Sequence, residues 1–396
     1  MEMSETASSG PFTFPKTDQA AKLSIFKPEP ATAKLIAELS DPAQSLKVHR
    51  QQARELARLG TEQTIGSLQS ALHGGLSPYV KAAIGEGLGE NSHPEAMPVL
   101  LEMIQDADET AARGAIRGLS LRGDAESAQV LDKVLFDEHA AESVRTEAAL
   151  ALGDIRQAAA LASLTRAATE WSDSSLTESV LEGLGKRPFS ETEDFFRSYL
   201  ESSALTTEGK VIAVEALANS FGEAGPLLLN LARDPDPDVR AAAAWSLISS
   251  GEESNLSAPL ISLLQQEPVP SVRSRLYEAL ANQDGWDVSV VLGLAKNETD
   301  PQARMKALGA LATTFRSSPS TESLAYFNDT AVPELKQTAL TDTSPQDRVS
   351  SVMVLAQGRT PESTAALAEI SNQAHDAKVV EAAEAALHRS SAGSPR

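Results

Sequence analysis

The sequence contains no cysteine and few aromatic residues. None of its 396 residues is a cysteine, and aromatic side chains make up only 4%. Without thiolates the chain forms no disulfide, binds no iron–sulfur cluster, attaches no c-type haem and has no cysteine nucleophile. Because aromatics are scarce while 41% of the residues are hydrophobic, thin helical layers packed through Ala and Leu are favoured.

A basic surface is also missing. Lys and Arg number 34 against 55 Asp and Glu, which gives a formal net charge of −21. Such a chain repels phosphate, so nucleic-acid binding would need a concentrated basic patch. The densest basic stretch, residues 47–58, has cations at helical spacing and is interpreted as a solvated helix face. We therefore expect no nucleic-acid partner and no attraction to anionic membranes.

Long apolar runs are absent as well. No run approaches the roughly 18–20 residues that span a bilayer, so no membrane insertion is expected. The first residues carry no apolar leader segment, which indicates the cytoplasm. Removal of a leader from a longer precursor would instead indicate an exported or periplasmic protein. The sequence leaves the oligomeric state open.

What the sequence does contain is a repeat. The pattern V-R-x-x-A-A-x-A-L-G recurs, as VRTEAALALG from Val144 and VRAAAAWSL from Val239. A leucine near the end of each copy returns every 30–33 residues, with one step of 44; these anchor leucines are Leu88, Leu119, Leu152, Leu184, Leu217, Leu247, Leu280, Leu311, Leu355 and Leu387. A second amphipathic segment and turn signals lie between successive copies.

Each repeat therefore predicts one helix hairpin, which buries its apolar faces only by stacking on neighbouring hairpins. The predicted fold class is all-α: an α-solenoid forming a right-handed superhelix of about eleven stacked helix hairpins.

The motifs of the repeat point to a family. Its length, the Asp-Pro-x-Val-Arg opening at residues 236–240 and the Ala-Leu-Gly close resemble HEAT repeats. They are most similar to the short bacterial type first named from phycobilisome-lyase-like proteins. The resemblance covers residues 29–389 and implies the solenoid fold. It implies little about function, because such repeats occur in scaffolds, adaptors, lyases and hydroxylases alike.

Four segments depart from the repeat. Residues 1–28 and 390–396 are predicted to be flexible tails. Residues 187–209 are irregular and gather aromatics on one helix, where core packing is the favoured interpretation. An insertion near residues 317–333 predicts either a protruding loop or a helix extension.

A column of cations accompanies the anchor leucines. Seven residues before the anchor, seven of the ten copies carry Lys or Arg, namely Lys81, Arg145, Lys210, Arg240, Arg273, Arg304 and Arg348. The family resemblance implies a structural ladder between repeats, and the alternative is an anion-binding stripe. Asp238 and Glu147 are expected to neutralise these cations locally.

A search for catalytic constellations finds none. The six histidines include no pair at i, i+4, and there is no His-Glu dipeptide of the kind that di-iron HEAT hydroxylases use. We expect no catalytic residue, no metal and no cofactor.

One column predicts a surface for partner binding. Two residues before the anchor, consecutive copies carry Glu182, Glu215, Trp245 and Glu278, with Glu178 one turn earlier. The second helix of such hairpins usually lines the concave side of a solenoid. An exposed Trp among carboxylates suits a basic peptide or helix. The alternative is that Trp245 is partly buried and the glutamates only solvate the surface.

Two functional hypotheses follow. The first is a non-catalytic scaffold or adaptor for protein–protein interaction, which binds a partner segment along the concave acidic groove. The alternative is an accessory or maturation factor resembling phycobilin lyase subunits and acting on a protein client.

Overall fold

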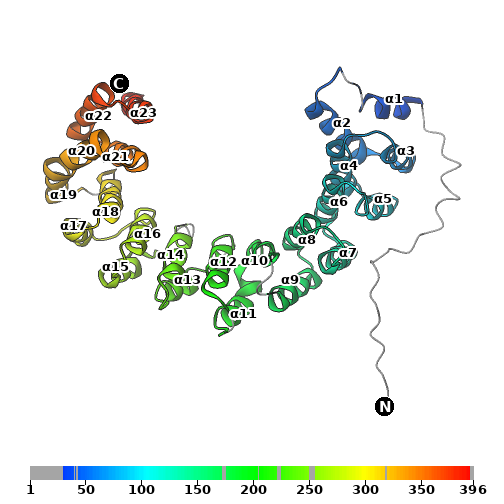
Figure 1. Ribbon diagram of the computed structural model, residues 1–396, viewed down its shortest axis with the longest axis horizontal. Coiled ribbons are helices and arrows are strands. Elements are labelled where there is room, and N and C mark those ends of the chain that lie inside the picture. Colours follow the sequence, from blue (N-terminus) through cyan, green and yellow to red (C-terminus); the bar gives the residue numbers. More distant parts are fainter. Residues whose placement is uncertain are drawn as a thin grey trace, which may run out of the picture. The chain divides into compact units, whose positions relative to one another are not determined.

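The structure is a computed structural model, described here for residues 30–39, 41, 43–171, 175–203, 205–220, 224–248, 255–316 and 319–392. The regular elements of these residues are all helices (Figure 1), which confirms the all-α prediction. The predicted N-terminal tail, residues 1–28, lies outside the described residues, as do residues 393–396 of the C-terminal tail.

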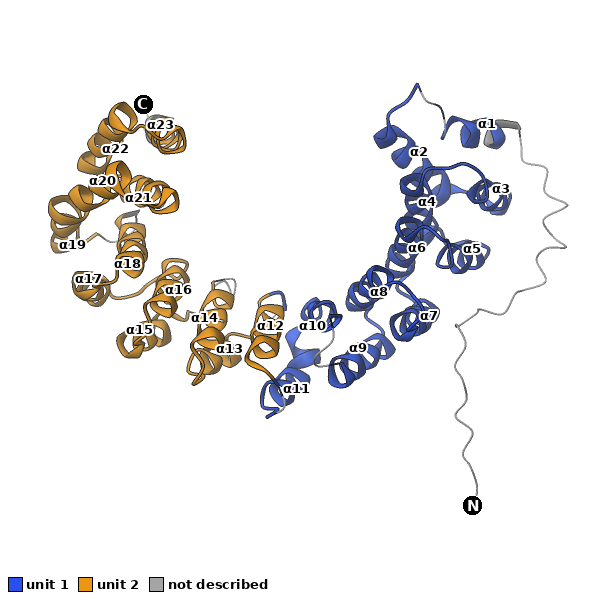
Figure 2. Cartoon of the chain, in the orientation of Figure 1, with its two compact units in different colours: residues 1–205, 219–221 blue, residues 206–218, 222–396 orange. Residues whose placement is uncertain are grey.

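The chain divides into two compact units (Figure 2): residues 1–205 and 219–221 form unit 1, and residues 206–218 and 222–396 form unit 2. Taken in chain order, the described helices pair into eleven hairpins when α19 to α20 is counted as one first helix. This number agrees with the prediction of about eleven hairpins.

In unit 1 the second helices of the hairpins pack side by side, and the first helices form a layer against them. The second helices are α2 (Leu46–Leu59), α4 (Pro78–Glu90), α6 (Glu109–Arg122), α8 (Glu142–Asp154) and α10 (Thr177–Gly185). The first helices are α1 (Pro30–Glu38), α3 (Glu62–Leu72), α5 (Ala96–Met103), α7 (Ala125–Phe136), α9 (Ala158–Glu170) and α11 (Phe189–Leu200).

Unit 2 repeats this two-layer arrangement. Its second helices are α12 (Thr207–Leu217), α14 (Pro237–Ser246), α16 (Pro270–Ala281), α18 (Pro301–Thr313), α21 (Pro345–Gly358) and α23 (Ala377–Ala392). Its first helices are α13 (Gly225–Leu231), α15 (Ser257–Gln266), α17 (Val288–Asn297), α19 (Thr321–Tyr326) with the π-helix η3 (Phe327–Ala331) and α20 (Val332–Thr341), and α22 (Pro361–Gln373).

The anchor leucines form the centre of this packing. Nine of the ten are at most 1% exposed, and Leu387, in the last described helix, is half-buried. Burying one such side chain contributes about 1.5–3 kcal/mol. The repeated leucine therefore stabilises each layer of the stack.

The Asp-Pro opening of the repeat is a helix start. Asp236 and Asp300 are N-caps whose carboxylates accept hydrogen bonds from backbone N–H groups of the first turn, at 2.9–3.1 Å. The proline that follows each of them occupies the first helical turn, where its fixed φ fits and no N–H is needed.

The insertion near residues 317–333 continues a helix. From residue 321 onward it belongs to α19, η3 and α20. Phe327 of η3 is fully buried and lies edge-on to Phe315, with 5.1 Å between ring centroids. Of the two alternatives, the described residues show the helix extension. In the irregular segment, Phe189, Phe196 and Tyr199 of α11 are buried as core residues.

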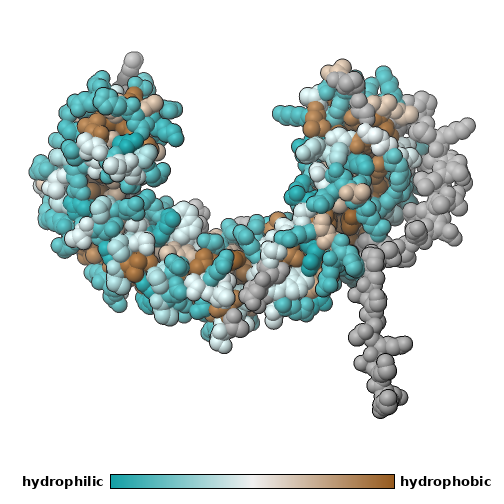
Figure 3. All heavy atoms as spheres, viewed as in Figure 1, coloured by the Kyte–Doolittle hydropathy of each residue, from teal (hydrophilic) through white to brown (hydrophobic). Residues whose placement is uncertain are grey.

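The described surface visible in Figure 3 is mostly hydrophilic, and apolar residues show there as small separate patches. None of the described helices is both long enough and apolar enough to cross a bilayer.

Glycines on α4 and α6 allow the two backbones to touch. A Cβ on Gly85 would lie 2.7 Å from the backbone nitrogen of Ala115, and one on Gly89 would overlap the carbonyl oxygen of Gly118. Gly309 of α18 differs, because a Cβ there would meet only Gln357 Oε1 and Val354 Cγ2, both at 3.5 Å.

We therefore expect opposite results from two identical substitutions. Gly89→Ala should lower the free energy of unfolding by about 1–3 kcal/mol, because α4 and α6 must separate. Gly309→Ala should raise it by about 0.4–1 kcal/mol, because the fit is unstrained and the unfolded chain loses freedom. Urea denaturation followed by circular dichroism measures both, and equal effects would contradict the packing described.

Candidate partner-binding face

Six of the seven column cations pair with a carboxylate in the next hairpin. The partner lies 24–30 residues further along the chain each time. The pairs are Lys81–Asp106 (2.8 Å), Lys210–Asp234 (3.5 Å), Arg240–Glu267 (2.8 Å), Arg273–Glu298 (2.7 Å), Arg304–Glu334 (2.6 Å) and Arg348–Asp376 (2.5 Å).

Each arginine of these pairs also bonds to a turn of its own hairpin. Arg273 donates from Nε and Nη2 to the two carboxylate oxygens of Glu298, at 2.7 and 2.8 Å. Its Nη1 donates to the carbonyl oxygens of Glu267 and Pro268. Arg240 does the same with the carboxylate of Glu267 and the carbonyls of residues 234–235. Through these bonds one turn is tied to the next.

Arg145 is the exception. Its guanidinium lies over the ring of Trp171, 5.0 Å from the centroid, and its Nε donates to the carbonyl of Leu135. Trp171 follows α9, so this cation also reaches the next hairpin, where an aromatic ring replaces the carboxylate.

The acids expected to neutralise this column lie elsewhere. Glu147 pairs with Arg113 and Arg117, at 2.8 and 2.7 Å, and Asp238 forms no ion pair with the described residues. The expectation was wrong because a shift of two residues turns a helix by about 200°, so that neither acid shares the face of the neighbouring cation.

Glu298 illustrates the electrostatics of these pairs. Its side chain is 3% exposed. Burial raises the pKa of its carboxyl, but the hydrogen bonds and charge of Arg273, with backbone N–H bonds, outweigh burial and leave the pKa below its usual value.

A lowered pKa in the folded state predicts acid sensitivity. Stabilisation by ionised Glu298 is fully present above its unfolded pKa of about 4.3, and it is lost as the pH falls through the lower folded pKa. Glu298→Gln should therefore be less stable than wild type at pH 6, with a gap that narrows toward pH 3. A gap in unfolding free energy that stays constant over this range would contradict the assignment.

In unit 1 the face of the second helices is cross-linked by ion pairs. Arg54 of α2 pairs with Glu86 and Glu90 of α4, and Arg117 of α6 pairs with Glu86 and with Glu147 of α8. On α2, α4, α6 and α8 these charges are matched to one another. Glu178 and Glu182, predicted for partner binding, lie on α10 of unit 1, where both are exposed.

The corresponding face of unit 2 holds a groove of about 630 Å³ over α12, α14 and α16. We call it the Trp245 groove and define it by Glu208, Val211, Glu215, Asp238, Trp245 and Arg275. The indole of Trp245 is 50% exposed. Glu215 and Trp245, both predicted from the sequence, thus line one depression.

The acids of this groove are not neutralised. Glu208, Glu215 and Asp238 are exposed and form no ion pair with other residues in the described part of the chain. The cation of the groove, Arg275, lies over the Trp245 ring at 4.5 Å.

Glu278, the third predicted residue in unit 2, is already paired. It accepts a bond from Arg275 at 3.0 Å and pairs with Lys306 at 2.6 Å. The structure therefore places Glu278 between two cations rather than in an open acidic surface.

Sequence reasoning missed Glu208, Asp238 and Arg275. The first two carried a usable signal, because each stands nine residues before its anchor leucine, Leu217 or Leu247. Arg275 gave no such signal, since its position over Trp245 depends on how α14 and α16 pack.

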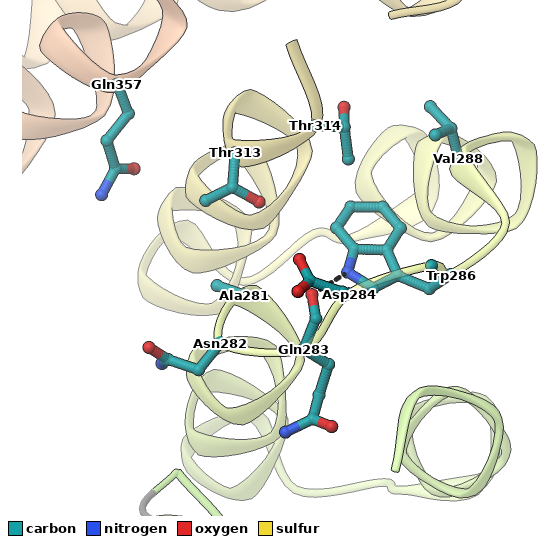
Figure 4. A pocket seen from close by; sticks show the side chains of 10 residues that line it. Ala281, Asn282, Gln283, Asp284, Trp286, Val288, Thr313, Thr314 and Gln357 are labelled. Carbon is teal, nitrogen blue, oxygen red and sulfur yellow. Dashed lines mark hydrogen bonds between the residues drawn. The ribbon is translucent and has the colours of Figure 1, made fainter. Parts of the chain in front are cut away.

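Further depressions lie in unit 2, and two of them border α16. Figure 4 shows one of about 480 Å³, where Trp286 donates from its indole N–H to the carbonyl of Gln283 at 3.1 Å. The other, of about 390 Å³, is bounded by α16, α18 and α21 and includes Met305, Gly309 and Met353. Among the described residues, no group of three or more His, Asp or Glu is placed to hold a metal ion.

A family model described as HEAT repeats matches residues 65–143, 104–185 and 194–281, which is more than half of the chain. The chain belongs to the HEAT-repeat family. The closer resemblance to phycobilisome-lyase-like repeats is not shown by the comparisons. No curated protein matches this HEAT-repeat chain.

Solved structures that resemble this HEAT-repeat protein include the karyopherin Kap121p. Kap121p bound to Pho4p matches with 15% identity and a TM-score of 0.47, over 93% of this chain and 46% of that one. Kap121p bound to Nup53p matches with 16% identity and a TM-score of 0.47, over 93% of this chain and 46% of that one. An engineered protein matches with 19% identity and a TM-score of 0.36, over 92% of this chain and the whole of the engineered chain. The chain thus spans about half the length of the Kap121p chains.

Proposed function

We propose that this HEAT-repeat protein is a non-catalytic scaffold or adaptor that holds a basic segment of a partner protein in the Trp245 groove. One observation carries the proposal: a half-exposed Trp stands beside three carboxylates that lack cations among the described residues. The nearby ladder cations Lys210, Arg240 and Arg273 are paired with Asp234, Glu267 and Glu298, so they do not neutralise these three carboxylates.

The chemistry of the groove favours a Lys- or Arg-containing occupant. A cation over an indole contributes about 0.5–2 kcal/mol, depending on how dry the site is. Large, rigid aromatic side chains are also frequent anchors of protein interfaces. Glu208, Glu215 and Asp238 surround that anchor with charge complementary to a basic segment.

Arg275 prepares the groove for exchange. In the free protein it covers the Trp245 ring while bonding to Glu278. When a partner cation replaces Arg275 over the ring, Arg275 keeps its hydrogen bond to Glu278, so neither charge is left unpaired. The position of Arg275 over Trp245 therefore supports the proposal, because it shows that a cation fits there.

Affinity purification from the source organism tests the proposal. With wild type a partner should co-purify in stoichiometric amount. With the Trp245→Ala/Glu215→Lys variant the amount recovered, measured by quantitative mass spectrometry, should be at least tenfold lower, because the aromatic anchor and a negative charge are both removed. Glu126→Lys on α7 is the matched control, since Glu126 is exposed in unit 1. It makes a single Glu-to-Lys change and should retain the partner.

Unchanged partner recovery by the groove variant, with its circular dichroism intact, would contradict the proposal. The retained partner should also dissociate as salt is raised from 50 to 200 mM, because exposed ion pairs are screened.

A further inference from the structure

A gap interrupts the row of side chains on the second helices of unit 2. The residues two before the anchor leucine are Glu215, Trp245, Glu278, Gly309 and Met353 in successive hairpins. Gly309 alone in this row has no side chain, and the depression of about 390 Å³ lies at its position.

The gap is spare space rather than a packing requirement. A Cβ on Gly309 would lie at ordinary van der Waals distance, 3.5 Å, from Gln357 and Val354. Gly85 of unit 1 differs, since a Cβ there would approach backbone at 2.7 Å. The helix packing of unit 2 therefore tolerates a side chain at position 309, and the open volume can receive one from outside.

Apolar side chains of Met305, Val349 and Met353 line one part of the gap, and polar residues that include Glu278, Lys306 and Gln357 line the rest. Met353 is 46% exposed, Met305 is 9% exposed and Val349 is half-buried. Methionine side chains are flexible and polarisable, so they fit apolar groups of varied shape. We call this site the Gly309 socket and define it by Met305, Gly309, Val349 and Met353.

The charges beside the socket are matched to each other. Lys306 Nζ lies 2.6 Å from the carboxylate of Glu278, which also accepts from Arg275. This cluster separates the socket from the Trp245 groove. Since the neighbouring cation is already paired, the socket suits an apolar group better than a charged one.

We infer that the Gly309 socket receives an apolar side chain of the same partner segment whose basic residues lie in the Trp245 groove. This inference rests on the proposed function. Trp245 is on α14 and Gly309 on α18, two helix spacings away, or about 16–20 Å. An extended chain covers that distance in roughly five or six residues. The partner segment thus carries a Leu, Met or Phe about six residues from a basic cluster.

Methyl NMR of the full chain tests the inference, because the six methionines give a simple spectrum. Three synthetic 14-residue peptides serve as probes: a Lys cluster with Leu six residues after it, one with Leu six residues before it, and a version with Ser in place of Leu. The Leu peptide whose chain direction matches that of the bound segment should shift the methyl signals of Met305 and Met353. The signals of Met97 and Met103, which are buried in unit 1, should stay unchanged. This Leu peptide should bind about tenfold more tightly than the Ser peptide, the factor expected from partly burying one aliphatic side chain.

A filled socket provides the matched variant. Gly309→Met should remove the tenfold advantage of Leu, while Gly309→Ala, which fits the packing, should remove less of it. Trp245→Ala should weaken both peptides alike.

The outcomes separate the two proposals. If Leu and Ser peptides bind equally and the Met305 and Met353 signals stay in place, the socket inference is overturned while the Trp245 groove stands. If neither peptide binds, both proposals fail. If the two methyl signals move on raising the protein concentration without peptide, a second copy of the chain occupies the socket, which also overturns the inference.

Discussion

The fold depends on an arginine that bonds to two consecutive turns. Arg240 and Arg273 each hold a carboxylate of the next hairpin with two hydrogen bonds and the carbonyls of their own turn with the third nitrogen. A planar guanidinium makes these bonds together, whereas an ammonium has no such fork. Lys210, which begins the series in unit 2, pairs with Asp234 at the longer distance of 3.5 Å. Arg240, Arg273, Arg304 and Arg348 join consecutive hairpins of unit 2 in this way, and the buried leucines supply the apolar stabilisation.

Charge is used differently on the faces of the second helices. In unit 1, Arg54, Glu86, Arg117 and Glu147 neutralise one another across four helices. In unit 2, three acids around Trp245 have no cation among the described residues, and one position in the row is a glycine. A repeat that is nearly uniform in its core thus varies on this face through a few residues. That is where a repeat protein gains recognition without altering its stack.

Much of this fold could be predicted from the sequence, because the spacing of the repeated residues gives the length of each structural unit. The anchor leucines, the hairpins and the Asp-Pro helix starts all follow from residue types at fixed spacing. The partners of the cation column did not follow, since they depend on which turn of the next hairpin faces each guanidinium. Local neutralisation by Asp238 and Glu147 was the wrong expectation, because two residues along a helix point to nearly opposite faces. For the insertion the sequence allows a protruding loop or a helix extension, and the consecutive helical elements α19, η3 and α20 distinguish the two.

For the candidate site, the sequence predicted Glu215 and Trp245 but not what lies around them. The exposure of Trp245, the cover that Arg275 provides and the neutralisation of Glu278 are all products of packing between α14, α16 and α18. The sequence shows a glycine, Gly309, at the repeat position two residues before the anchor leucine. The distances around it in the structure show that the space beside it is not filled by neighbouring side chains.

A double-mutant cycle on Arg240 and Glu267 tests the tie between hairpins most directly. The cycle compares unfolding free energies of Arg240→Ala, Glu267→Ala, the double variant and wild type in urea. Because the pair is bidentate and largely buried, the account predicts a coupling free energy of about 1.5–3 kcal/mol. A coupling free energy near zero would mean that these ion pairs do not hold the stack together.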